Sequence, residues 1–390
     1  MIKQDIPKIR FYSYQGAWTE NRIADIVKIS AGGDVDKERL KEIGRYPVIA
    51  NALTNKGIVG FYDDYKVKAP AVTVTGRGDV GYAVARHENF TPVVRLLTLQ
   101  SENIDVDYLE NQINSIRILN ESTGVPQLTA PQLGNYKVYH PEIEEQSAIG
   151  SLFRTLDDLL ASYKDNLTNY QALKMTMLSK MFPKAGQRVP EIRLDGFEGE
   201  WEVIQLSDIC QKVTEKNKDN NFNETFTNSA EFGIISQRDF FEKDISNEKS
   251  LNAYYVVRNN DFVYNPRISN YAPVGPVKRN KLGRTGVMSP LYFVFRITNS
   301  NIDLNFLETF FNTNTWHKFM KLNGDSGARA DRFAIKDSTF LTMPIAFPSF
   351  PEQQAIGAYF SNLDNLINSH QEKISQLETL KKKLLQDMFI

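Results

Sequence analysis

Basic side chains gather in one stretch in the second half of the chain. Residues 262–302 contain six lysines and arginines and no aspartate or glutamate. The same stretch is rich in asparagine, serine, threonine, tyrosine and glycine. Cationic side chains bind phosphate oxygens, and short polar side chains can hydrogen-bond to base edges. The stretch is therefore typical of a surface that faces nucleic acid, although charge alone leaves open a solvated charged face.

Further candidate contacts lie outside this stretch. Residues 317–336 add basic side chains, and the first half of the chain has a milder basic signal that Asp79 and Glu88 partly offset. The DNA-binding residues that we predict are Arg77, Arg86, Arg95, Arg267, Lys278, Arg279, Lys281, Arg284, Arg329 and Arg332.

Motifs for catalysis are missing from the sequence. There is no Gly-x-x-x-x-Gly-Lys-Ser/Thr phosphate loop, and the nearest approach to the Asn/Asp-Pro-Pro-aromatic motif of amino-methyltransferases is Asn265-Pro266-Arg267. The four histidines are scattered, and Cys210 has no companion at metal-ligand spacing. We therefore expect a non-catalytic chain with no metal site and no cofactor of its own.

Composition places the chain among globular proteins. Its 390 residues are enough for two or three domains, and 41% are hydrophobic. No apolar run approaches the roughly 18 residues of a membrane span. A single cysteine and the absence of an export signal after Met1 predict the cytoplasm. The net charge of -1 means that acidic residues elsewhere offset any basic surface.

An internal repeat organises the chain. Residues 145–182 recur at 352–389, beginning with Glu-Gln-x-Ala-Ile-Gly in both copies and with about 15 of 38 positions identical. A lead segment, residues 6–11, recurs at 189–194, and a tryptophan follows each copy. The material between differs in length and shows little resemblance. The order is thus lead, variable module and repeated segment, twice, and because the lead is present we expect no truncation at the amino terminus.

The repeated segments have apolar residues at heptad spacing and predict helices of about 38 residues, roughly 57 Å long. Both seams contain a lysine at the same place, and a polar seam residue can fix the register of two helices. Glycines at 150 and 357 weaken the first turns. We expect the helices to pair as an antiparallel coiled coil; the alternative is that each seam is core of its own module. The predicted seam is Phe153, Leu156, Leu160, Leu167, Lys174, Phe360, Leu363, Ile367, Ile374 and Lys381.

The variable modules predict a mixed α/β (α+β) fold. Strand-like runs occur at 71–75, 93–99, 261–264 and 291–295, and helix-like stretches occur near 105–120 and 303–322. We predict a first module at 1–143, a first helix at 144–184, a second module at 185–348 and a second helix at 349–390.

In this doubled order the chain resembles the DNA-specificity subunits of Type I restriction-modification systems. The repeated Glu-Gln-x-Ala-Ile-Gly opening carries the resemblance, together with the segments Ser122–Thr129 and Asp325–Phe333 before the two helices. Residues 46–51 and 76–81 also look like a target recognition domain of that family. The resemblance covers essentially the whole chain.

This resemblance implies that each module is a target recognition domain for one half of a split double-stranded DNA sequence. The paired helices would be a spacer that binds two modification subunits, which carry the adenine methyltransferase. Restriction subunits with motor and nuclease activity would complete the complex, and S-adenosylmethionine, ATP and Mg²⁺ would belong to the partner subunits. The alternatives are the recognition subunit of a combined restriction-modification enzyme and a coiled-coil adaptor that binds no DNA.

Overall fold

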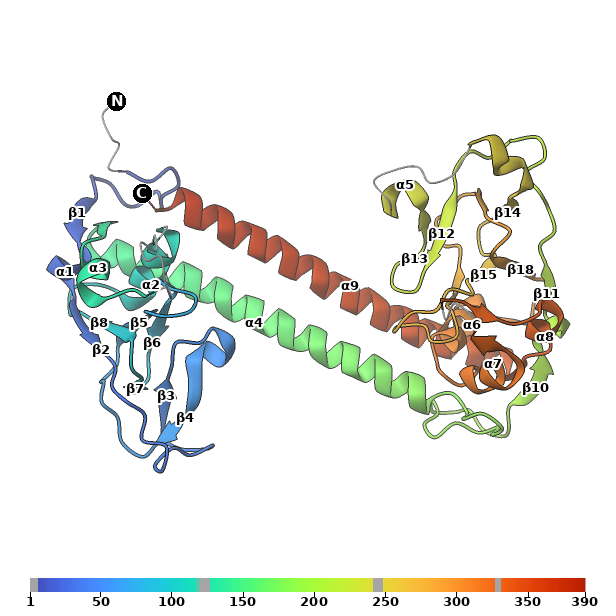
Figure 1. Cartoon of the computed structure of the whole chain (residues 1–390), viewed down its shortest axis with the longest axis horizontal. Coiled ribbons are helices and arrows are strands. Elements are labelled where there is room, and N and C mark those ends of the chain that lie inside the picture. The colour runs from blue at the N-terminus through green and yellow to red at the C-terminus, as the bar shows by residue number, and fades with distance from the viewer. Residues whose placement is uncertain (1–5, 117, 119–126, 241–247, 327–330, 390) are drawn as a thin grey trace. The chain divides into compact units, whose positions relative to one another are not determined.

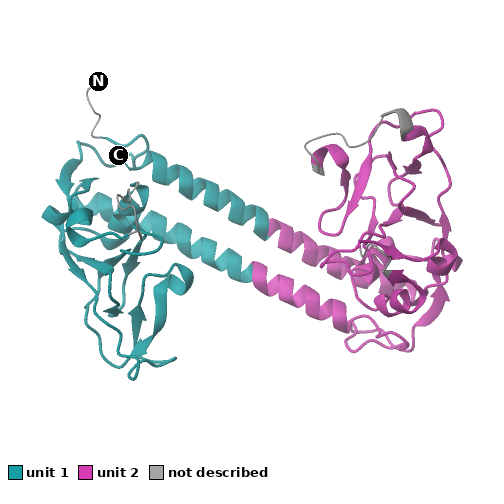
Figure 2. Cartoon of the chain, viewed as in Figure 1, with its two compact units in different colours: residues 1–166, 370–390 teal, residues 167–369 magenta. Residues whose placement is uncertain are grey.

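The computed structural model covers the whole chain and describes residues 6–116, 118, 127–240, 248–326 and 331–389. Two compact units divide the chain (Figure 2). Unit 1 comprises residues 1–166 and 370–390, and unit 2 comprises residues 167–369. The boundaries fall within the two long helices, so each helix contributes residues to both units.

A four-stranded antiparallel sheet forms the centre of unit 1 (Figure 1). Helix α2 (Val106–Ser115) packs on one face, where alternate strand residues such as Val72 and Val74 meet Leu109 and Ile113. This is the alternation that a strand with one face on a helix requires. In spatial order the strands are β2 (Lys28–Ala31), β8 (Leu96–Gln100), β5 (Ala71–Thr75) and β6 (Ala83–Arg86).

A second, smaller β-layer covers part of the other face of this sheet. Ile49, Phe90 and Leu96 are in the core between the two layers. The layer contains β4 (Ile58–Tyr62), β3 (Tyr46–Ile49) and β7 (Thr91–Pro92). The remaining short elements of unit 1 are β1 (Thr19–Arg22), α1 (Ile23–Ile26), η1 (Thr54–Gly57), α3 (Ala130–Gly134) and β9 (Lys137–His140), with β1 paired to β9.

Unit 2 has a central antiparallel sheet with the same strand order. Helix α6 (Leu304–Phe311) packs on it through an aromatic core that includes Phe262, Phe295 and Phe306. In the order that matches unit 1, the strands are β11 (Cys210–Lys212), β18 (Phe293–Ile297), β15 (Phe262–Tyr264) and β16 (Val277–Arg279). The two modules therefore share a fold that their sequences do not show, because small aliphatic residues fill one core and aromatic residues fill the other.

Short strand pairs and helices surround the sheet of unit 2. The pairs are β10 (Glu202–Gln205) with β21 (Pro344–Phe347), β12 (Phe226–Ser229) with β13 (Gly233–Ser236), β14 (Tyr255–Val257) with β17 (Gly286–Met288), and β19 (Asp325–Ser326) with β20 (Phe333–Ala334). The helices are η2 (Leu206–Asp208), α5 (Gln237–Phe240), η3 (Glu248–Ala253), α7 (His317–Asn323) and α8 (Asp337–Leu341).

The repeated segments form the long helices α4 (Ile143–Lys180) and α9 (Phe350–Asp387). Ion pairs between the helices give their direction within each unit. In unit 1, Asp157 binds Lys381 and Lys164 binds Glu378, so residue numbers rise on one helix as they fall on the other. In unit 2, Lys174 binds Asp364. The helices are therefore antiparallel.

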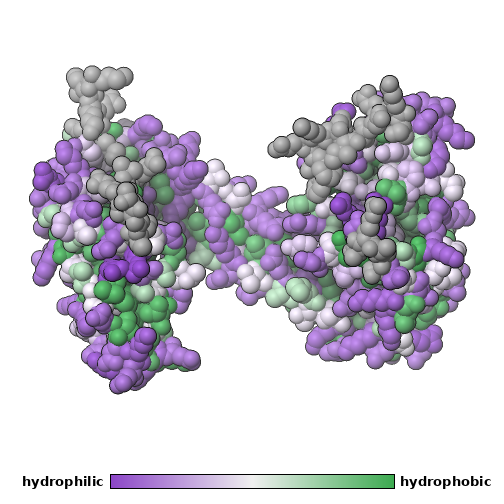
Figure 3. All heavy atoms as spheres, viewed as in Figure 1, coloured by the Kyte–Doolittle hydropathy of each residue, from purple (hydrophilic) through white to green (hydrophobic). Residues whose placement is uncertain are grey.

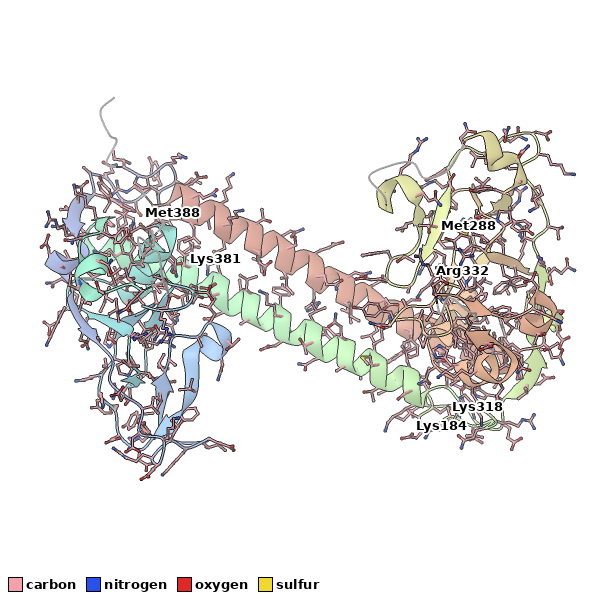
Figure 4. All side chains as sticks on the ribbon, viewed as in Figure 1. Lys184, Met288, Lys318, Arg332, Lys381 and Met388 are labelled. Carbon is pink, nitrogen blue, oxygen red and sulfur yellow. The ribbon has the colours of Figure 1, made fainter. Side chains whose placement is uncertain are left out.

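Burial along the helices follows the heptad positions. Phe153, Leu156 and Leu160 are buried in α4, and Phe360, Leu363 and Ile367 are buried in α9. The next positions, Leu167 and Ile374, are half-buried. Lys174 and Lys381 are also half-buried, and both bind aspartates that the same repeat offset of 207 relates, Asp364 and Asp157. Figure 4 labels Lys381 on α9 and Met388 just beyond its end.

A buried carboxylate joins the start of each helix to the lead segment before its module. Arg10 donates two hydrogen bonds to Glu145, from Nε at 2.7 Å and from Nη2 at 2.6 Å. Arg193 binds Glu352 in the same way at 2.8 and 2.7 Å. Both glutamates are at most 2% exposed. In both copies of the repeat, the lead segment is thus bound to the Glu-Gln opening of the helix through this ion pair.

The residue after each buried glutamate ties the helix to its module. Gln146 accepts a hydrogen bond from the backbone N–H of Asp105, the N-cap of α2, at 3.0 Å. Gln353 does the same for Asp303, the N-cap of α6. A Cβ on Gly150 would lie 2.5 Å from Oδ1 of Asp105, and one on Gly357 would lie 2.6 Å from Oδ1 of Asp303. The glycines inside the helix pattern therefore allow close approach to these caps.

The end of each repeated segment is anchored in a core. Phe182 packs against Phe306 and Phe360 in unit 2. Phe389 packs against Tyr108 and Phe153 in unit 1. Within the described residues, no helix is both long and apolar enough to cross a membrane.

The predicted fold class is confirmed, but several elements differ in extent. The helix expected near 105–120 ends at Ser115, and the one expected near 303–322 is two helices, α6 and α7. The strand expected at 93–99 starts at Leu96, because Arg95 has a positive φ of 69° that extended backbone does not allow.

Removing the lead-segment arginine should destabilise unit 1 strongly. Arg10→Leu leaves the buried Glu145 carboxylate without its partner, which costs about 3–5 kcal/mol. Chemical denaturation of the full chain measures this. The matched control is Arg39→Leu, because Arg39 binds Asp64 at 2.8 Å on the surface, with side chains 55% and 67% exposed. An exposed pair is worth about 0–1 kcal/mol. An equal loss of unfolding free energy in the two variants would show that the Arg10–Glu145 pair is worth no more than an exposed ion pair.

Replacing a seam lysine should raise stability and loosen the register. Lys381→Leu removes a half-exposed ion pair and extends the apolar seam, so we expect a gain of about 1 kcal/mol in unfolding free energy. Lys382→Leu, on the exposed side, is the control. Register is measured by the yield of a disulfide between cysteines placed at 164 and 378, which face each other in an ion pair. An unchanged yield in the Lys174→Leu/Lys381→Leu double variant would argue against a register role.

Candidate nucleic-acid interface

One exposed arginine follows the central strand of each sheet. Arg77 comes two residues after β5, and Arg267 comes three residues after β15. Each arginine forms an isolated antiparallel β-bridge with a residue in the segment before a short helix. Arg77 pairs with Gln127 before α3, and Arg267 pairs with Arg332 before α8. All four of these residues are exposed. The same backbone arrangement therefore presents a polar pair on each module.

Close backbone packing brings a third predicted residue to this place in unit 1. A Cβ on Gly76 would lie 2.2 Å from the carbonyl oxygen of Arg95 and 2.9 Å from that of Leu128. Asn51 accepts a hydrogen bond from the Gly76 N–H at 2.8 Å and donates one to the carbonyl of Val94 at 3.1 Å. Glycine is required here because two chain segments meet at its backbone. The exposed side chains of Arg77 and Arg95 consequently start from adjacent segments.

A shallow hollow adjoins Arg77 in unit 1. Its volume is about 520 Å³, and its lining includes the turn from Gly78 to Tyr82, with Leu53 and Asn114. Asn114 holds this turn against α2, since its side chain accepts from the N–H of Ala83 and donates to the carbonyl of Ala83. Tyr82 is 45% exposed at the edge. The surface beside Arg77 is thus concave, and both polar and apolar residues line it.

In unit 2 the corresponding arginine, Arg267, lies in a segment that backbone hydrogen bonds join to residues 331–333. The carbonyl of Pro266 accepts from the Phe333 N–H at 2.7 Å, and the Ile268 N–H donates to the carbonyl of Asp331 at 2.9 Å. Figure 4 labels Arg332 in this region. Tyr271 lies in the turn that the bridge between Ser269 and Ala272 closes, and it is 83% exposed.

Three of the predicted basic residues of unit 2 bind other protein groups. Arg279 is 9% exposed and binds Glu308 at 2.8 Å. Arg284 binds both carboxylate oxygens of Glu224 at 2.7 and 2.6 Å. Lys278 donates to Asn312, and burial lowers the pKa of its ammonium group. The acidic partners, Glu308 and Glu224, lie outside the basic stretch 262–302, so part of its local charge of +6 is neutralised in the folded chain.

Arg86 is likewise held inside unit 1. It donates from Nε to Thr73 at 2.9 Å and from Nη2 to the carbonyl of Lys56 at 2.7 Å. Burial lowers the pKa of this guanidinium to about 10, against the opposing charge of Glu110. Arg86 therefore stabilises the module in this structure.

The other candidates differ in their surroundings. Lys281 is exposed, with its Nζ 3.5 Å from Glu308. Arg329 lies outside the described residues. The DNA contacts of all ten residues stay a prediction, and the geometry favours Arg77, Arg95, Arg267 and Arg332, which are exposed and lie at the two equivalent places.

No metal-binding arrangement accompanies these residues in the part of the chain that the structure describes. There, no three histidine, cysteine, aspartate or glutamate side chains form a group that could hold a metal ion. Cys210 is buried, and burial raises the pKa of its thiol to about 12. A thiol of this kind is a poor nucleophile near neutral pH.

Sequence reasoning missed several partners that position these surfaces. Gln127 was not selected, because its role appears only when the bridge to Arg77 is known. Asp157 and Asp364 were also missed, although both occupy the same place in the repeat, 17 residues before a seam lysine. The recurrence of an aspartate and a lysine at the same spacing in both repeats is thus the sequence signal that indicates Asp157 and Asp364.

Comparison with known proteins identifies the class. The sequence profile of the family described as Type I restriction modification DNA specificity domain matches residues 15–169 and 198–379. The chain therefore belongs to this family, and each module with its helix corresponds to one match.

Individual relatives agree with this assignment. A putative Type I restriction enzyme MjaX specificity subunit of Methanocaldococcus jannaschii is 22% identical over 94% of this chain and 92% of its own length. A putative type I specificity subunit of Mycoplasma pneumoniae is 26% identical over 35% of this chain and 39% of its own length. The matches thus span about two fifths of the M. pneumoniae relatives and 64% of the MjaVIII specificity subunit.

A solved structure has the same fold. The Type-I restriction-modification system S subunit from M. genitalium superposes with a TM-score of 0.65 over 99% of both chains, at 14% sequence identity.

Glu110 in α2 should make unit 1 less stable as pH rises. Burial, with the nearby charge of Asp157, raises the pKa of its carboxyl to about 7. An unfolded chain ionises this group near 4.5. Between these values the folded state binds the extra proton, so stability falls as pH increases from about 4.5 to 7. Thermal unfolding of Glu110→Gln should lack this fall, whereas the exposed-site control Glu102→Gln should retain it. A wild-type melting temperature that does not change between pH 4.5 and 7 would contradict a raised pKa of Glu110.

Proposed function

We propose that this chain is the DNA-binding specificity subunit of a Type I restriction-modification complex and that its two modules bind the two halves of a bipartite duplex target. The observation that carries the proposal is that both modules present an exposed arginine at the same place in the same sheet topology, each opposite a different polar residue. Equal folds with unequal contact residues suit recognition of two different half-sites.

The long helices supply a surface for partner subunits. Leu159 and Leu366 are 42% and 43% exposed, and Leu173 and Leu380 are 38% and 44% exposed. The repeat relates the members of each pair, so two similar apolar surfaces occur. Figure 3 shows hydrophobic atoms among hydrophilic ones along the helices. Two copies of one modification subunit fit this duplication.

The chemistry in this scheme belongs to the partners. The modification subunits transfer the methyl group from S-adenosylmethionine, and restriction subunits use ATP and Mg²⁺ for translocation and cleavage. The specificity subunit contributes target selection only. Such a complex acts on the DNA of the cytoplasm.

Charge reversal in one module should affect target binding through that module. Arg77→Glu and Arg267→Glu each remove a cation from one predicted interface. Each variant should weaken binding of the mapped target duplex, because it places a carboxylate where a cation would face the DNA, and the loss should be greatest at low salt. The measurement is a salt titration of binding by the complex with its modification subunit.

Arg188→Glu is the control, because Arg188 is exposed and bound to Glu200 outside these bridges. Mapping of methyladenine in a host that expresses the wild-type complex tests the proposal itself. A continuous methylated sequence, or methylation that does not depend on this chain, would contradict it.

A further inference from the structure

We infer that the bridged pairs Arg77–Gln127 and Arg267–Arg332 select bases: the pair in unit 2 binds two guanines of one half-site, and the pair in unit 1 binds a guanine and an adenine of the other. This rests on the proposed function and assigns part of the target to named residues.

The two pairs occupy equivalent positions. In unit 1 the N–H of Leu128 donates to the carbonyl of Gly76 at 2.9 Å, and in unit 2 the N–H of Phe333 donates to the carbonyl of Pro266 at 2.7 Å. Leu128 and Phe333 are buried, at 4% and 7% exposure, and are core residues of their modules. A slip of one residue would expose these core side chains, so the register of each bridge is fixed.

Fixed register sets the direction of the four polar side chains. Directly opposed residues of an antiparallel pair point to the same side, with Cβ atoms about 4.5–5.5 Å apart. Arg77 and Gln127 therefore project together, as do Arg267 and Arg332. All four are exposed, and no ion pair or side-chain hydrogen bond to another described residue holds any of them. They differ in this from Arg279 and Arg284, which bind glutamates.

The pair in unit 2 is unfavourable for the folded chain alone. Two like charges directly opposite each other destabilise a strand pair, and no carboxylate of the described residues binds either guanidinium. An electronegative ligand that accepts several hydrogen bonds at short spacing would relieve the repulsion. Adjacent guanines present such acceptors in the major groove.

The chemistry of the side chains gives the base preference. Arginine donates two hydrogen bonds to O6 and N7 of guanine, and glutamine both accepts from N6 and donates to N7 of adenine. Two arginines therefore favour two guanines, on one strand or across neighbouring base pairs. An arginine with a glutamine favours a guanine beside an adenine. The asymmetry of the two half-sites follows from one exchanged residue at an equivalent position.

The test exchanges that residue. Arg332→Gln gives unit 2 the pair of unit 1, and Gln127→Arg gives unit 1 the pair of unit 2. Each variant is expressed with the modification subunit, and methyladenine is mapped across the host genome. We expect Arg332→Gln to change one guanine requirement in one half-site to adenine and to leave the other half-site unchanged. Gln127→Arg should do the reverse in the other half-site.

Binding to duplexes that carry single base changes gives the magnitude. The favoured base should change with a discrimination of about 5- to 150-fold, as expected for one bidentate contact. Arg332→Lys retains the charge but loses the fork, so it should retain methylation while guanine discrimination falls. Arg188→Gln is the control and should change neither half-site.

Two results would overturn the inference. One is an unchanged target in both exchange variants; the other is a uniform loss of methylation in Arg332→Gln, Arg332→Lys and Gln127→Arg without any change of base preference, which indicates phosphate contacts only. In both cases a bipartite wild-type target leaves the proposed function standing. Absence of a bipartite target in the wild type would instead refute the proposed function itself.

Discussion

The buried glutamate at the start of each long helix requires a positively charged partner, and the ion pair that satisfies it fixes the lead segment to the helix. A carboxylate at most 2% exposed is costly unless several hydrogen bonds satisfy it. Arg10 and Arg193 supply a bidentate pair, which draws each lead segment against the helix that follows its module. The next glutamine then binds the N-cap of the module helix. Lead segment, module and long helix are thereby fixed at one point, so the module loops can vary freely without disturbing the frame.

That separation explains how one fold supports two recognition surfaces. The central sheets have the same strand order, yet Val72 and Val74 fill one core where Phe262 and Tyr264 fill the other. Although the core residues differ, both modules retain the antiparallel bridge that follows the central strand, Arg77 with Gln127 and Arg267 with Arg332. The proposed contact residues Arg77, Gln127, Arg267 and Arg332 lie at backbone positions next to core residues, and their side chains are exposed. Under the proposed function, a new target would require changes only at exposed positions.

The repeat made the helices, the lead segments and the order of parts predictable, because heptad spacing and identity at a fixed offset are properties of sequence alone. The common fold of the modules was not predictable, since packing volume can be conserved while residue types change. The basic stretch illustrates a second limit. Its acidic partners, Glu224 and Glu308, lie outside residues 262–302, so a count of charge along the chain overstated the free charge. The pairing of Arg77 with Gln127 depends on a bridge between segments 50 residues apart, which no local pattern encodes.

The place of Phe389 has a consequence for the order in which the chain folds. This residue follows α9 and packs against Tyr108 and Phe153 in the core of unit 1. During synthesis the first module leaves the ribosome early, but its aromatic surface has no cover until Met388 and Phe389 have been added. In unit 2 the corresponding residue, Phe182, precedes its module, so the core of that unit waits only for Ile356 and Phe360 at the start of α9. The unit translated first is therefore completed last, and its exposed aromatic surface is the one that a nascent chain must protect.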